Sequence, residues 1–255
     1  MEIVYKEVMQ EFDELFALLA DIVPAPVAAP RDKGIVFRYV EQSIEQAIIQ
    51  KLTRYISGLR AARVLLDRGF LQESTVLQRT LDEFGEDIMF LSLAVVANEQ
   101  TAIHETYLKA FYADDFENTN DPMGSIRNRQ KRVTRKEVRK AIDQSNATIA
   151  TRVGGEFVSA TEQVWAIGKL FSGFVHGGSP QIMEMYGGKP PHFHLEGMPD
   201  IPLVAVHEES FWNQYYRCGQ SFAIAAQALG SPEVFSRAQD LLKELERAAG
   251  KAYDG

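Results

Sequence analysis

The sequence predicts an all-α fold, a helical bundle built on one long antiparallel helix hairpin. Apolar residues recur at steps of three and four from Ile44 to Leu66 and again from Leu77 to Val95, which is the spacing of one face of a helix. Between the two runs lies Arg68-Gly69, and a glycine in this position can take the left-handed conformation that ends many helices. The expected contacts inside the hairpin are Leu59, Leu66, Leu77, Leu81, Phe84 and Ile88.

Composition limits the class of protein. The chain has 255 residues, of which 45% are hydrophobic and 24% charged, as in ordinary globular proteins. Its net charge of −8 argues against a protein that coats nucleic acid with its whole surface. The single cysteine, Cys218, cannot form an internal disulfide, and no long uncharged run is present. We expect a cytoplasmic protein with no membrane segment.

The first thirty residues are expected to form a helix and a connector. Apolar residues between Ile3 and Ile22 keep helical spacing, and Pro24, Pro26 and Pro30 then interrupt the helix and stiffen the chain. We expect residues 1–255 to form one helical domain, with the helix and connector in 1–30 and the bundle in 36–250. An amphipathic first helix needs a partner surface, so we also expect a homodimer.

The remainder of the chain predicts more helices and one irregular segment. We expect helices at 101–116, 156–176, 208–229 and 232–249, with a mobile turn at 118–125. Glycine and proline are dense near 177–206, and this segment should be irregular or a short β-hairpin. In the second case Ile182–Tyr186 would pair with His192–Leu195. Ser231-Pro232-Glu233 predicts the start of the final helix, with a cap, a first-position proline and a first-turn acid.

Residues 127–140 form a basic segment. They contain eight basic residues opposed only by Glu137. One interpretation is a patch that tracks phosphates on RNA through Arg127, Arg129, Lys131, Arg132 and Arg135. The other is a helix face that neutralises acids of this protein or of a partner, and the lack of aromatic residues inside the segment favours it. The expected partner is therefore RNA or an acidic protein.

Several familiar site motifs are missing from the sequence. It contains no Glu-x-x-His pair of a di-iron bundle, no His-Glu-x-x-His, no phosphate-binding loop and no Gly-x-Ser-x-Gly. His192, His194 and Glu196 alternate as ligands on a strand would, yet the adjacent prolines favour a simple surface hairpin. We therefore predict neither a metal ion nor a cofactor.

The second helix of the hairpin carries the most concentrated polar residues. Arg79 and Glu83 are one helical turn apart and can pair, and three more acids, Asp82, Glu86 and Asp87, lie beside them. We expect these acids to form an exposed lattice of ion pairs with basic residues such as Arg60 and Arg63 of the first helix.

His176 ends an apolar helix beside two glycines. The C-terminal end of a helix favours a protonated histidine, and the glycines allow a ligand to come close. A histidine in the last turn of a helix is also a common cap, so the sequence allows both a reactive group and a cap.

Two short motifs resemble an uncharacterised bacterial family of helical proteins that is distantly similar to the HEPN superfamily. They are Arg79-Thr-Leu-Asp-Glu83 in the hairpin and Ser172-Gly-Phe-Val-His176 in the later helix. The resemblance implies that Arg79, Glu83, Ser172 and His176 form the site, and it associates the protein with nucleic-acid-directed or defence-type systems. HEPN ribonucleases are similar in placing an arginine shortly before the histidine, and none stands at 169–172 here.

Two functional hypotheses follow. The first is a binding or interaction module that meets RNA or an acidic protein through its basic segment. The second is a HEPN-like, metal-independent ribonuclease in which His176 is the general acid or base and Arg79 or Lys169 stabilises the developing charge. The missing motifs favour the first.

Overall fold

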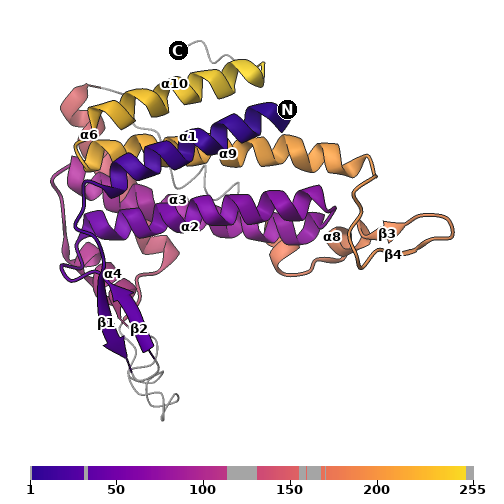
Figure 1. Ribbon diagram of the computed structural model, residues 1–255, viewed down its shortest axis with the longest axis horizontal. Helices are drawn as coiled ribbons and strands as arrows, with labels where there is room; N and C mark the ends of the chain where they lie inside the picture. Colours follow the sequence, from indigo (N-terminus) through magenta and orange to yellow (C-terminus); the bar gives the residue numbers. More distant parts are fainter. Residues whose placement is uncertain are drawn as a thin grey trace.

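A computed structural model describes residues 2–31, 34–113, 131–154, 159, 168–169 and 171–250. In this part of the chain the predicted all-α class is confirmed. Long helices lie side by side in the body, a two-stranded hairpin projects from one end, and a short helix with a smaller hairpin lies at the other (Figure 1). The elements are α1 (Glu2–Ala20), β1 (Val27–Arg31), β2 (Gly34–Arg38), α2 (Ile44–Asp67), α3 (Leu71–Val96), α4 (Ala102–Tyr112), α6 (Arg135–Val153), α8 (Ser179–Met183), β3 (Tyr186–Gly187), β4 (His192–Phe193), α9 (Leu203–Ala228) and α10 (Pro232–Ala248).

The antiparallel pair α2 and α3 is the predicted central hairpin. Ser43 caps α2, because its hydroxyl accepts a hydrogen bond from the backbone N–H of Gln46 at 3.2 Å. In turn, the backbone N–H of Ser43 donates to the side-chain oxygen of Gln46. At the turn, Gly69 has a φ of +74°, as the sequence indicated. Met198 donates a backbone hydrogen bond to the Gly69 carbonyl at 2.9 Å. A side chain on Gly69 would collide with this backbone at 2.3 Å, so glycine is required here for two reasons.

The interior of the hairpin follows the predicted apolar pattern with two differences. Leu59, Leu66, Leu81 and Ile88 are fully buried, whereas Leu77 and Phe84 are half-buried at its edge. The Phe84 ring instead lies beneath two cations, Lys51 and Arg54, at 5.5 and 5.6 Å from its centroid.

The first helix packs within the same chain. The side chains of Phe12, Leu15 and Leu19 are fully buried, and the Phe12 ring stacks on Phe222 of α9 at 5.3 Å. Arg237 of α10 makes two hydrogen bonds of 2.8 Å to the Glu11 carboxylate. The surface that α1 needs is therefore supplied by α2, α9 and α10.

The segment after α1 differs from the predicted proline connector. Residues Val27–Arg31 and Gly34–Arg38 pair as antiparallel strands, with Pro30 opposite Ile35. A proline is compatible with an edge strand because its missing N–H can face solvent. We missed these strands because the prolines and the short alanine run lack the alternation of a half-buried strand.

The later chain also differs in detail from the prediction. Within the expected irregular segment, Ser179–Met183 form the helix α8, and the β-hairpin is confined to Tyr186–Gly187 paired with His192–Phe193. Ser231 caps α10 as predicted, with Val234 donating to its hydroxyl at 3.4 Å. The expected loop at 118–125 and most of the expected helix at 156–176 lie outside the described residues. None of the described helices has a stretch long and apolar enough to cross a membrane.

Candidate functional site

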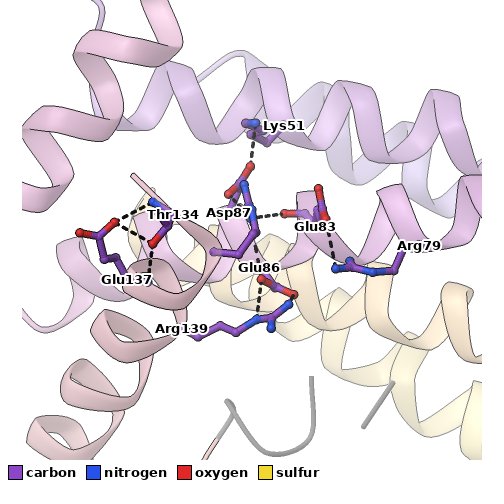
Figure 2. Close-up of polar contacts among 9 residues, drawn as sticks. Lys51, Arg79, Glu83, Glu86, Asp87, Thr134, Glu137 and Arg139 are labelled. Atoms are coloured by element: carbon purple, nitrogen blue, oxygen red, sulfur yellow. Dashed lines mark hydrogen bonds and ion pairs between the residues drawn. The ribbon is translucent and has the colours of Figure 1, made fainter. Parts of the chain in front are cut away.

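The polar face of α3 is the centre of the candidate site. Here the expectation of an exposed ion-pair lattice is wrong, because Asp82, Glu86 and Asp87 are buried. A buried carboxylate loses its hydration and requires cations or hydrogen-bond donors nearby. The structure supplies them from α2 and α6 for Glu86 and Asp87 (Figure 2), and from α9 for Asp82.

Glu86 and Asp87 join α3 to α6. Arg139 makes a bidentate contact with the Glu86 carboxylate, with hydrogen bonds of 3.1 Å from Nε and 2.9 Å from Nη2. Arg135 lies 2.7 Å from an Asp87 carboxylate oxygen, and Lys51 of α2 lies 2.7 Å from the other. Consecutive helical residues point in different directions, so Arg139 contacts Glu86 and Lys51 contacts Asp87. Arg135 is shared, because its Nη1 also lies 3.8 Å from Glu86 Oε2. Together these contacts fix α6 across α3.

Asp82 forms a second buried cluster with α9. Its Oδ1 atom lies 3.0 Å from Arg217 Nε and accepts a hydrogen bond of 3.1 Å from Gln214 Nε2. Tyr55 of α2 donates its hydroxyl to the Gln214 side-chain oxygen at 3.2 Å. Burial raises the pKa of Asp82, and the positive charge of Arg217 opposes this shift. Cys218 is buried beside this cluster and acts as a small core residue, and burial raises the pKa of its thiol.

The four residues of the HEPN-like motifs do not form one polar network. Arg79 and Glu83 pair at 3.1 Å, as their spacing predicted. Ser172 and His176 are exposed, and within the described part of the chain no hydrogen bond or ion pair joins either side chain to Arg79 or Glu83. The two regions are nevertheless neighbours, because a Cβ on Gly168 would lie 3.8 Å from Arg79 Nε.

The structure places a different histidine in the packed interior at this end of the bundle. His207 of α9 is buried, and its Nδ1 lies 3.2 Å from the Thr75 hydroxyl. Phe174 packs edge-to-face on the His207 ring at 5.9 Å, which orients the helical residues 171–175 against α9. Burial lowers the pKa of His207, with a smaller opposing effect from Glu184. This histidine is therefore a packing group whose burial favours the neutral form.

The basic segment divides into residues that face inward and residues that face solvent. Arg135 contacts Asp87, so its charge is balanced inside the chain. Lys131, Arg132, Lys136 and Lys140 are exposed, and we call these four residues the basic surface. Arg127 and Arg129 lie outside the described residues. Thr134 caps α6, and its hydroxyl and backbone N–H both donate to the Glu137 carboxylate. The only acidic side chain of residues 127–140 is therefore engaged in the helix cap.

A hollow of about 270 Å³ lies between α4 and the start of α6. Its lining includes Lys51, Arg132 and Arg135 together with the rings of Tyr107 and Phe111. The Phe111 ring centroid lies 4.9 Å from Lys51 Nζ. The basic segment itself contains no aromatic residue, and the sequence did not indicate these two rings because they come from another helix.

The possible metal ligands at the β3–β4 hairpin do not form a cluster. The rings of His192 and His194 lie 4.3 Å apart, and His192 Nδ1 is 2.9 Å from the Pro190 carbonyl. Across residues 2–31, 34–113, 131–154, 159, 168–169 and 171–250, no three His, Cys, Asp or Glu side chains are grouped to hold a metal ion.

Comparisons of the chain with protein-family models, curated proteins and solved structures found no match. The HEPN-like resemblance stays an expectation from the two motifs.

We predict that α6 depends on the Arg139–Glu86 contact. Replacing Arg139 with Met leaves Glu86, whose side chain is only 3% exposed, without its bidentate partner. The free energy of unfolding should fall by about 3 kcal/mol, the usual scale for a buried carboxylate that loses its cation. Lys243→Met is the matched control, because it removes an exposed contact to Asp240 and should cost less than about 1 kcal/mol. Urea denaturation of both variants measures the difference, and equal losses would contradict the prediction.

Proposed function

We propose that this protein is a helical binding module that holds single-stranded RNA at the hollow between α4 and α6. One observation carries the proposal: the hollow combines cations with aromatic rings. Arg132 belongs both to its lining and to the basic surface, and Phe111 supplies a half-buried ring beside it. Proteins that hold single strands without reading their sequence use this combination, with cations for phosphates and rings for base stacking.

The distribution of charge supports a local binding region on an acidic protein. Whole-chain charge is −8, so a polyanion is repelled by most of the surface. Arg135 and Lys51 share the single negative charge of Asp87, so most of the positive charge near the hollow comes from the four residues of the basic surface. Such a module fits the nucleic-acid-directed systems that the HEPN-like resemblance suggests. An acidic protein is the other partner class that this charge could attract.

We predict that the basic surface and Phe111 contribute in different ways to RNA affinity. Replacing all four residues of the basic surface with Gln removes phosphate contacts, so affinity should fall and the slope of log affinity against log salt should flatten. Phe111→Leu should weaken binding by about 1–3 kcal/mol with an unchanged salt slope, since stacking does not release counterions. Fluorescence anisotropy with a short labelled single-stranded RNA at several salt concentrations measures both quantities.

The control for this experiment removes the same charge elsewhere. Four exposed basic residues outside the region are changed to Gln together: Lys6, Lys189, Lys243 and Arg247. If the control weakens RNA binding as much as loss of the basic surface, the attraction is not local and the proposal fails. Binding of polyglutamate but not RNA would assign the surface to an acidic protein instead.

A HEPN-like ribonuclease is the alternative, favoured by the packing of Gly168 against Arg79. We predict that His176→Ala leaves the stability of the fold within about 1 kcal/mol, as expected for an exposed residue in a last helical turn. We also expect no RNA cleavage that depends on His176. The assay incubates labelled RNA with wild-type and variant protein in EDTA. Cleavage by the wild type that falls by about 10²-fold or more in the variant would instead support a general acid or base at this position.

The homodimer is also a proposal, now supported by the β1–β2 hairpin instead of α1. Ile35 and Phe37 alternate along β2 and therefore share one face, where they are 72% and 66% exposed. We predict a dimeric mass in light scattering that becomes monomeric in Ile35→Asp/Phe37→Asp. Val153→Asp, at an equally exposed apolar position on α6, should leave the mass unchanged. A monomeric wild-type protein would contradict the proposal.

A further inference from the structure

A cavity of about 80 Å³ lies beside Asp82, between α2, α3, α6 and α9. It is separate from the hollow next to the basic surface. Its lining includes Asp82, Gly85, Met89, Ile142, Arg217 and Ile224. Half of the lining residues are polar or charged, but the surface that faces the cavity is mostly apolar, which is the usual character of a small-molecule site.

Gly85 is the first observation that indicates a ligand in this cavity. It lies in the middle of α3, where glycine destabilises a helix relative to alanine. Its φ is not in the left-handed region, so the backbone does not require glycine. Packing does not require it either, because a Cβ would lie at ordinary contact distances, 3.4 Å from Tyr55 Cε1 and 3.6 Å from Ser221 Oγ. By contrast, a Cβ on Gly58 of α2 would lie 2.6 Å from Leu81. The missing side chain at Gly85 keeps the cavity open.

Asp82 is the second sign. Its side chain is 6% exposed, and its Oδ1 atom is occupied by Arg217 and Gln214. The Oδ2 atom is buried and has no hydrogen-bond partner within the part of the chain that the structure describes. A buried polar atom without a partner is costly, and an ionised carboxylate oxygen can only accept a hydrogen bond. A molecule in the cavity that donates a hydrogen bond would satisfy this atom.

The other walls define the rest of such a molecule. Met89, Ile142 and Ile224 surround it with apolar surface, so its body should be hydrocarbon. The charges at the polar side are balanced, since Arg217 pairs with Asp82 and Arg139 pairs with Glu86. A cation would meet the Arg217 guanidinium, which favours a neutral molecule. The volume suits about four or five non-hydrogen atoms, being smaller than the roughly 150 Å³ cavity that holds benzene.

From these observations we propose that the cavity binds a small neutral molecule, with an apolar body of a few carbons and one hydroxyl or N–H group that donates to Asp82 Oδ2. Binding at this position goes beyond the proposed RNA contact and uses none of the residues of the basic surface.

Two isomeric probes test the hydrogen bond. 1-Butanol and methyl propyl ether have the same atoms, but only the alcohol can donate. Methyl NMR of the full-length protein should show saturable shifts at Met89, Ile142 and Ile224 on addition of 1-butanol. The ether should bind at least about tenfold more weakly, because it leaves the carboxylate oxygen without a partner. Equal affinities for the two isomers would overturn the proposal. So would shifts with 1-butanol that never saturate, because water would then be the only occupant of the cavity.

Gly85→Ala tests the location. The new methyl group should fill part of the cavity and weaken 1-butanol binding by at least about tenfold, while alanine in the helix keeps or raises the melting temperature. Ser210→Ala is the matched control, because it changes an exposed position of α9 away from the cavity and should leave binding unchanged. Unchanged binding to a folded Gly85→Ala protein would contradict the location. Tighter binding of butylammonium than of 1-butanol to the wild type would contradict a neutral ligand.

Discussion

Burial of three carboxylates on α3 is the constraint on which the arrangement of the other helices depends. Asp82, Glu86 and Asp87 would each be strongly unfavourable in the interior without a cation. Their cations come from three other helices: Lys51 of α2, Arg135 and Arg139 of α6, and Arg217 of α9. Apolar burial is non-directional, so it restricts the register of these helices less than specific ion pairs do. The ion pairs allow only positions in which every carboxylate is matched, so we interpret them as setting the register of α2, α6 and α9 on α3.

The same contacts change how the basic segment must be interpreted. In the sequence, residues 127–140 read as a strongly positive stretch. In the fold, Arg135 and Arg139 neutralise α3, and the charge offered to a partner is carried by residues on the outer side. The neutralising interpretation therefore holds for Arg135 and Arg139, and the phosphate-tracking interpretation stays a proposal for the outward residues. The helical period places Arg135 and Arg139 on the inward side of α6 and Lys136 and Lys140 on its outer side.

Local patterns predicted local structure well and long-range polar contacts poorly. Spacing of apolar residues, the Ser231-Pro232 cap and Gly69 indicated the helices and the central turn, because these signals act within a few residues. The burial of Asp82 could not be predicted in this way, since it depends on Arg217 and Gln214, more than 130 positions later. The rings of the hollow are a similar case, because only the fold brings Tyr107 and Phe111 to Arg132. Ser172 and His176 show that a motif can also suggest too much. The motif identifies these residues, but it does not determine where their side chains lie, and both are exposed.

One helix takes part in both proposed sites, and this has a thermodynamic consequence. Ile142 of α6 forms part of the cavity wall, and the start of the same helix borders the hollow with Arg135. Glu86 lines the cavity and also holds Arg139, so filling the cavity and docking α6 involve the same carboxylate. A molecule that contacts Ile142 stabilises the docked position of α6 relative to any displaced one. RNA bound at the hollow, as proposed, would do the same from the outer side. Linkage then requires that each ligand favour the other to an equal degree, with α6 as the element that both of them stabilise.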